Sequence, residues 1–167
     1  MIPFHYFKKN IMEIVRYPNK ILRAKSKEIS DFESPDIKKL IAEMIPTMKN
    51  ANGIGLAAPQ IGKNIRLTVI ETKNGPLPLI NPKIIKKSFK KEISEEGCLS
   101  LPGVFGTVKR HKKIKFKALT PEGQEMIYDA EGLFARVVQH EIDHLDGILF
   151  IDKAIEITEG KIKDEAK

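Results

Sequence analysis

Apolar side chains recur along the chain at two different periods, and these periods predict its helices and strands. Ser34-Pro35 is a typical helix start, and the segment that follows, 36–50, is expected to form a helix. The apolar residues of this segment fall on one helical face, as expected for a core: Ile37, Leu40, Ile41, Met44 and Met48. Pro46 lies within the same segment and is expected to kink or loosen the helix.

A second helix is predicted from about Glu131 to Leu145, where Asp146-Gly147 provides a common stop signal. Apolar residues cover almost its whole circumference, which is typical of a central, buried helix: Leu133, Phe134, Val137, Val138, Ile142 and Leu145. Between the helices, several segments have the composition of short strands: 65–71, 77–85, 106–119 and 125–132. The turn sequence TPEG joins the last two segments. The pattern therefore predicts an α+β fold of short antiparallel strands packed around a central buried helix.

Length and composition indicate one ordinary globular domain. The chain has 167 residues, of which 41% are apolar and 31% charged. No apolar run approaches the roughly 20 residues needed to span a bilayer, and the N-terminal sequence is too short and too mixed for a secretory signal. We therefore expect a cytoplasmic location without membrane contact. Residues 1–10 are expected to form an N-terminal extension, 11–155 the folded domain, and 156–167 a charged C-terminal tail.

The net charge of +7 is mostly lysine and is concentrated in two segments, 83–91 and 109–117. In the second segment basic residues alternate with residues that end in Ile114, Phe116 and Ala118, so the basic set is expected on one face of a strand. This pattern fits a solvated strand face, and it also fits weak attraction to an anionic surface such as the RNA of the ribosome. Charge alone does not distinguish between the two, and no specific DNA binding is predicted.

Two of the four histidines lie four residues apart on the second predicted helix, with a glutamate between them. His140 and His144 should therefore project from one face about one turn apart, with Glu141 nearby. This H-E-x-x-H pattern is typical of a divalent metal held by two imidazoles, with the glutamate able to act on a water at the metal. Two core histidines with backbone partners are the alternative. A buried helix favours the metal, because unpaired buried imidazoles would destabilise the fold.

The third metal ligand distinguishes between classes of metalloenzyme. The metzincin pattern matches through Gly147, but Phe150 stands where its last histidine would be. Only 23 residues follow His144, which leaves little room for the later helix that supplies a glutamate ligand in thermolysin-like proteases.

Cys98 is the single cysteine, and a lone cysteine is commonly a small buried hydrophobe. Here it lies in EEGCLSLPG, a glycine-flanked turn, and thiolate is a strong ligand for zinc or ferrous iron. Cys98 is therefore the preferred third ligand. Three protein ligands leave one coordination position open, which is typical of a catalytic metal.

Three segments together resemble the signature motifs of the peptide deformylase family: GIGLAAPQ at 53–60, EGCLS at 96–100 and QHEIDHLDG at 139–147. The first motif alone would indicate only a tight turn, but the three occur in the family's order and at suitable spacing. The resemblance identifies residues 11–155 as the catalytic domain. It implies an enzyme that removes the formyl group from the N-terminal formyl-methionine of nascent proteins. It also implies one divalent metal ion, with Fe²⁺ as the native metal and Zn²⁺, Ni²⁺ or Co²⁺ possible in preparations.

By the same resemblance, Cys98, His140 and His144 would bind the metal, and metal-bound hydroxide would attack the formyl carbon. Glu141 would act first as general base and then as general acid. A metalloprotease or another metal-dependent amidase is the alternative with similar chemistry. A basic RNA-binding module with a structural metal is a further alternative, although a structural site usually has four protein ligands.

The resemblance also implies how the substrate is held. The Gln60 side-chain amide and the Leu99 backbone N–H would donate to the developing oxyanion. Gly55 would let the substrate backbone lie against the chain in β-like pairing. Ile54 and Leu133 would line an apolar pocket for the methionine side chain.

Overall fold

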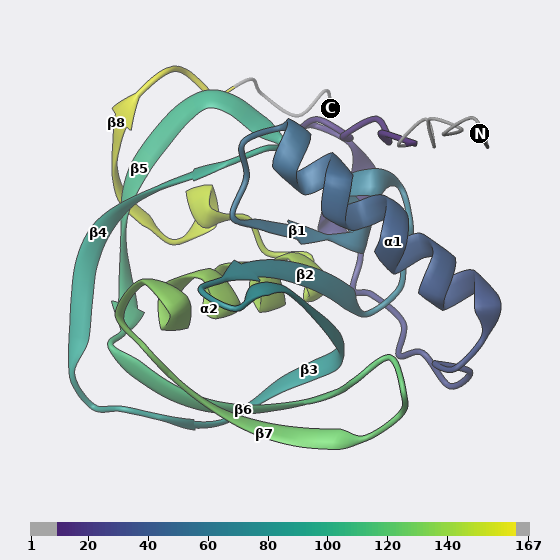
Figure 1. Ribbon diagram of the computed structural model, residues 1–167. Coiled ribbons are helices and arrows are strands. Elements are labelled where there is room, and N and C mark those ends of the chain that lie inside the picture. Colours follow the sequence, from purple (N-terminus) through teal and green to yellow (C-terminus); the bar gives the residue numbers. More distant parts are fainter. Residues whose placement is uncertain (1–9, 163–167) are drawn as a thin grey trace, which may run out of the picture.

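The helix α2 (Gly132–Leu145) packs between two antiparallel sheets in the computed structural model, which describes residues 10–162 (Figure 1). The first sheet has the order β1-β2-β3-β6-β7, with β1 at Gly55–Ala57, β2 at Leu67–Thr72, β3 at Gly75–Lys87, β6 at Lys113–Leu119 and β7 at Glu125–Glu131. The second sheet has the order β4-β5-β8, with β4 at Lys91–Cys98, β5 at Leu101–His111 and β8 at Ala154–Glu159. The predicted α+β fold around a buried helix is confirmed. Of the expected N-terminal extension, only Asn10 falls within the described residues.

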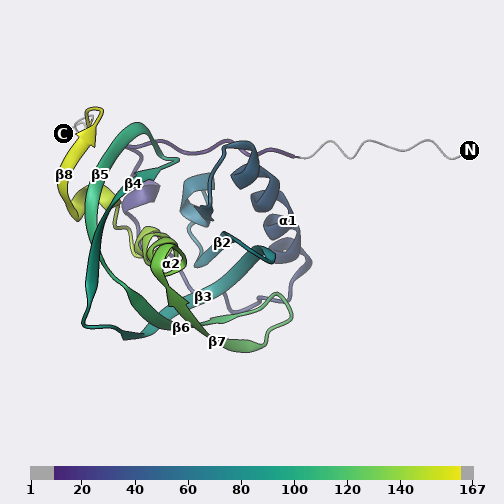
Figure 2. The same ribbon diagram turned by 60° about the vertical axis from the view of Figure 1, so that its left-hand side comes forward.

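The helix α1 (Pro35–Asn50) begins as predicted, because the Ser34 side chain accepts a hydrogen bond from the Ile37 N–H at 3.4 Å. The helix continues past Pro46 to Asn50, so the proline does not end it. Met44 and Met48 are fully buried in the core that α1 shares with β1 and β2. The strand β2 lies between α1 and α2 in Figure 2, and β1 and β2 both contact both helices, so the strand pair is covered on both faces. Short 3-10 helices complete the fold: η1 (Lys20–Arg23), η2 (Ala58–Ile61) and η3 (Phe150–Asp152).

The basic segment predicted as one strand forms two strands, which meet at Lys112 and belong to different sheets. In β6 the alternation is as expected, since Ile114, Phe116 and Ala118 are buried and the lysines between them face outward. The strand β4 was not predicted. Its sequence KEISEEGC is mostly charged and exposed, because β4 is the edge of its sheet and buries little apolar surface.

The prediction that α2 is apolar nearly all round is wrong in two respects. Leu133, at its first turn, is 68% exposed. The helix also buries several polar and charged side chains: Arg136, Gln139, Glu141, Asp143 and His144. The helix ends where predicted, with Gly147 at a φ of 74°. A side chain there would come within 2.4 Å of the Arg23 carbonyl oxygen, so the position requires glycine for both conformation and space.

The segment after η3 also differs from expectation. Residues 154–159 form β8, which pairs with β5, so the first part of the segment expected as a charged tail belongs to the second sheet. Ala154 and Ile157 supply the reason, because both pack against the core cluster that contains Val108 and Phe150. No helix within the described residues is both long enough and apolar enough to cross a bilayer.

Candidate active site

A cavity of about 540 Å³ opens between β1 and β4, the edge strands of the two sheets. The three motif segments supply its walls. Gly55 begins β1 and Ile54 directly precedes it, Gly97 and Cys98 end β4, and His140 and Glu141 lie on α2. The three motifs are far apart in sequence, yet the fold brings all three to this one cavity. Within residues 10–162 neither of these two strands has a strand partner on the cavity side, so the cavity is also bordered by backbone that can still form sheet hydrogen bonds.

The predicted metal ligands lie together at the base of this cavity. The Cys98, His140 and His144 side chains each offer one ligand atom, and these atoms lie within 4.8 Å of one another. The Cys98 Sγ and His144 Nε2 are 3.2 Å apart. Tetrahedral coordination with metal–ligand bonds of about 2.0–2.3 Å places ligand atoms roughly 3.5 Å apart, so the group fits one metal ion. Burial and the neighbouring His140 lower the pKa of His144, which favours the neutral form that a metal ligand needs.

Glu96 orients His140 from the second layer of the site. The His140 Nδ1–H donates to Glu96 Oε2 at 2.9 Å, which leaves Nε2 for the metal. Glu96 also accepts two hydrogen bonds from Arg110, both at 2.9 Å, and one from Arg136 at 2.8 Å. Burial alone would raise the pKa of Glu96, but the hydrogen bonds from Arg110 and His140 hold it well below its usual range. Glu96 is therefore an ionised carboxylate that is held in place by hydrogen bonds from three side chains, those of Arg110, Arg136 and His140.

The ion-pair network extends from Glu96 through Arg110 to Asp143 on α2. Arg110 pairs with Asp143, and Lys153 Nζ lies 2.7 Å from Asp143 Oδ1. These contacts join β5, α2 and the segment before β8. The sequence-based reasoning missed this network. One signal was available, because Glu96 lies two residues before Cys98 on the same strand face, and a histidine ligand usually donates its second N–H to a carboxylate or carbonyl.

Glu141 lies beside the metal ligands and is almost fully buried. Its Oε2 is buried and has no hydrogen-bond partner among the described residues. Burial is the largest effect on the pKa of Glu141 and raises it to about 7. A Cβ at Gly55 would lie 2.2 Å from Glu141 Oε1, so only glycine at that position leaves room for the carboxylate. Gly55 therefore determines where this acid can lie.

Gln60 is buried, and its amide is oriented by three contacts. Its Oε1 accepts from the Ala57 N–H at 2.9 Å, while its Nε2 donates to Ser100 Oγ at 3.2 Å and to Cys98 Sγ at 3.5 Å. The side-chain carbonyl of Gln60 thus accepts a hydrogen bond from the neighbouring backbone, and its NH₂ group faces the cysteine ligand. Leu99 lies in the tight turn between β4 and β5 and also lines the cavity.

The predicted substrate-binding residues form the outer wall of the cavity. Ile54 is 50% exposed and Leu133 is 68% exposed, and both line the cavity together with Gly55 and Val137. Phe105 covers the opposite wall, with its ring over Gly97, where a Cβ would lie 2.7 Å from the ring. Exposed apolar side chains at the mouth of a cavity are typical of a binding site. All nine predicted site residues therefore lie in or beside one cavity or its metal group.

Comparison with known proteins agrees with this geometry. The model of the polypeptide deformylase family matches residues 11–159. The chain belongs to this family. A peptide deformylase of Dictyoglomus thermophilum is 47% identical over 157 residues, which cover 94% of this chain and 99% of the relative. A peptide deformylase of Thermodesulfovibrio yellowstonii is 50% identical over 148 residues, which cover 86% of this chain and 88% of the relative.

Solved structures of the family have the same fold. The crystal structure of peptide deformylase from Thermotoga maritima matches with a TM-score of 0.85 and 40% identity, over 87% of this chain and 99% of that chain. A peptide deformylase from Synechococcus elongatus, in complex with actinonin, matches with a TM-score of 0.85 and 37% identity, over 93% of this chain and 85% of that chain. The family match extends to residue 159 and so includes β8. Membership of this family decides against the alternatives of a metalloprotease and of an RNA-binding module with a structural metal.

Proposed function

We propose that the cavity between β1 and β4 is where this deformylase-family chain hydrolyses the formyl amide of N-formyl-methionyl nascent peptides. The observation that carries the proposal is the pairing of a three-ligand metal group with a buried carboxylate oxygen that has no partner among the described residues. Three ligands leave a position for a reacting group, and an unpaired carboxylate oxygen beside it can accept a proton.

The metal group favours a divalent transition ion. One thiolate and two imidazoles suit ferrous iron, zinc, nickel or cobalt, and we propose Fe²⁺ as the native ion. When bound, such an ion supplies Lewis-acid chemistry: it makes hydroxide available near neutral pH and polarises the formyl carbonyl. Glu96 contributes by holding His140 in the tautomer and orientation that a ligand requires.

Glu141 is the proposed proton-transfer residue. Its Oε2 would accept the proton of the attacking water and then deliver it to the amine that leaves as the formyl–nitrogen bond breaks. Glu141 is not one of the three ligand side chains, so its carboxylate remains available for this role.

Gln60 and Leu99 are the proposed donors to the negative charge that develops on the formyl oxygen. The Gln60 Nε2 already faces Cys98, and its orientation is fixed before substrate arrives by the hydrogen bond from Ala57 to Oε1. The Leu99 backbone N–H lies in the next residue after the cysteine ligand. Donors that need no reorganisation stabilise a transition state more than mobile ones do.

The substrate backbone is proposed to lie as an extra strand between β1 and β4. Gly55 offers bare backbone on one side and Gly97 on the other, so a peptide can approach both edges closely. The methionine side chain would then enter the apolar part of the cavity beside Ile54, Leu133 and Val137. We also propose a cytoplasmic site of action and weak ribosome contact through basic surface, and the family's action on nascent chains supports both proposals.

A direct test compares two reactions of the purified, metal-loaded chain. Formate release from a formyl-Met tripeptide should be fast, while the internal peptide bonds of the same tripeptide should stay intact by mass spectrometry. Formyl-Gly and formyl-Asp tripeptides, which lack a long apolar side chain, should react much more slowly. Cleavage of internal bonds, or equal rates for all three peptides, would contradict the proposed substrate.

A further inference from the structure

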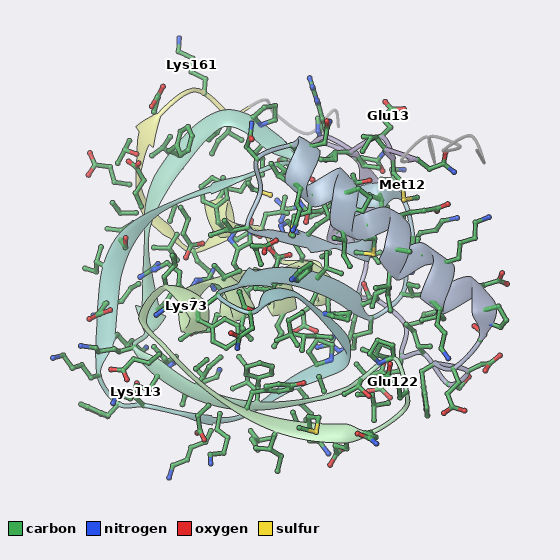
Figure 3. All side chains as sticks on the ribbon, viewed as in Figure 1. Met12, Glu13, Lys73, Lys113, Glu122 and Lys161 are labelled. Carbon is green, nitrogen blue, oxygen red and sulfur yellow. The ribbon has the colours of Figure 1, made fainter. Side chains whose placement is uncertain are left out.

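A polar side chain lies fully buried in β2, on the side of the strand that faces α2. Thr68 is this residue. Its neighbours Leu67 and Val69 belong to the core that α1 shares with β2, and because side chains alternate along a strand, Thr68 points the other way, toward α2. The strand packs against α2 (Figure 3), and Lys73, labelled there, follows its last residue. A hydroxyl in such a place is expected to have hydrogen-bond partners.

The Thr68 hydroxyl has two acceptors within reach, and both lie beside the same part of β1. Its Oγ1–H donates to the Leu56 carbonyl oxygen at 2.9 Å. The Glu141 carboxylate lies against the preceding residue, Gly55, where a Cβ would come within 2.2 Å of Oε1. Burial is the largest effect on the pKa of Glu141 and raises it, whereas a hydrogen bond from the Thr68 side chain acts to lower it. The hydroxyl therefore reaches the carboxylate as well as the carbonyl oxygen.

Thr68 touches the catalytic machinery at Glu141 and not at the substrate or the metal. It is not one of the three ligand side chains, and it is not among the described residues that line the cavity. Glu141 does line the cavity. An effect of Thr68 on the reaction would therefore pass through the position of the Glu141 carboxylate.

We propose that Thr68 is a positioning residue, whose hydroxyl holds the Glu141 carboxylate in place for proton transfer. This inference rests on the proposed function of Glu141. An ionised carboxylate is the stronger acceptor, so the hydroxyl hydrogen turns toward it. Once Glu141 carries the proton of the attacking water, the hydrogen returns to the Leu56 carbonyl oxygen, and the Thr68 oxygen can accept instead. The hydroxyl keeps a partner in both states, and the carboxyl group does not have to move between them.

The test compares Thr68→Val with Thr68→Ser in the full-length, nickel-loaded chain. Valine keeps the branched shape but removes the hydroxyl, whereas serine keeps the hydroxyl. Thr68→Val should lower kcat for formate release about 10- to 100-fold, as for loss of a hydrogen bond to a charged group, with KM and nickel content unchanged. Thr68→Ser should stay within about threefold of the unaltered chain. Equal losses in the two variants, or an unchanged kcat in Thr68→Val, would overturn the proposal.

Thr47 provides the matched control. It is also a buried threonine whose hydroxyl donates to a backbone carbonyl oxygen, that of Glu43 at 2.7 Å, but it lies on α1. Its Oγ1 accepts from the Met12 N–H at 2.9 Å, and Met12 is labelled beside α1 in Figure 3. Thr47→Val should lower the melting temperature and keep kcat. If kcat fell as far as in Thr68→Val, general loss of stability would explain both variants, and the proposal would fail.

A double-mutant cycle asks whether Thr68 acts through Glu141. In a Glu141→Gln background, Thr68→Val should change the residual kcat by less than about twofold, because the carboxylate that Thr68 positions is already absent. A loss as large as in the unaltered background would show that Thr68 acts elsewhere.

A crystal structure of the Thr68→Val variant gives a readout that does not depend on activity. The Glu141 carboxylate should leave its contact with Gly55 or occupy more than one position, and an unmoved carboxylate would contradict the inference. If the unaltered chain released no formate while the carboxylate moved in this way, the proposed function would be wrong and the positioning role of Thr68 would stand.

Discussion

The backbone of Gly55 packs so closely against the Glu141 carboxylate that no side chain fits between them, and Gly55→Ala tests the importance of this contact directly. The added methyl group would lie 2.2 Å from Glu141 Oε1, whereas ordinary van der Waals contacts of a Cβ begin at 3.4 Å, so the carboxylate must move by about 1.2 Å. A displacement of about 1 Å at a reacting group can reduce a rate about 10²-fold. We therefore expect kcat for formate release to fall by about 10²-fold while metal content is retained, because Glu141 is not a ligand.

The neighbouring glycine provides a matched control. A Cβ at Gly53 would lie 2.7 Å from Leu99 Cδ1, the end of a flexible side chain that can turn away. Gly53→Ala should therefore lose much less activity than Gly55→Ala. The measurements are steady-state formate release, metal content by mass spectrometry and thermal unfolding of both variants. Activity of Gly55→Ala within twofold of the unaltered chain, with metal and stability unchanged, would refute the proposed role of Glu141. Loss of metal would show instead that the contact maintains the ligands.

The other predictions concern single side chains of the site. Glu141→Gln should keep the metal and lose about 10²–10⁴ in turnover, and a fully active variant would remove Glu141 from the mechanism. Gln60→Ala should lower kcat by about 10²–10³ through loss of one fixed donor, whereas a change in KM alone would indicate only substrate binding. Glu96→Gln should weaken metal binding by about 10–100-fold in a competition assay with a chelator. It should also lower the free energy of unfolding by about 3–5 kcal/mol, since Arg136 would keep a buried charge without its carboxylate and Arg110 would keep only Asp143; a change below 1 kcal/mol would contradict this.

The elements that could be predicted from the sequence are those specified by nearby residues. The cap at Ser34, the stop at Gly147 and the histidine pair on α2 all depend on spacings of a few residues, and the structure has each of them. Cys98 lies 42 residues before His140, and it was identified by elimination and by family resemblance, not by any local period.

The features that escaped prediction depend on contacts between distant segments. Arg110 has a sequence setting like that of the lysines beside it, yet it is buried because Glu96 and Asp143 meet it from β4 and α2. Nothing in a period-two pattern distinguishes this arginine from its exposed neighbours. The strand β4 has too few apolar residues for any hydrophobic pattern, and it forms because β5 offers it a partner.

The position of His144 affects which amide bonds of a substrate could reach the metal group. His140 and Glu141 face the cavity, whereas His144 is 1% exposed and lies behind them, so the buried helix closes the inner end. In the proposed binding mode, a polypeptide between β1 and β4 would meet the metal group and the buried helix and could not pass through. Only a chain terminus, with a substituent as small as a formyl group beyond it, could then bring its first amide to that point. In the proposed binding mode the depth of the cavity would therefore set how far the reacting amide can lie from an end of the substrate, and the shape of the fold would favour a chain terminus over an internal segment.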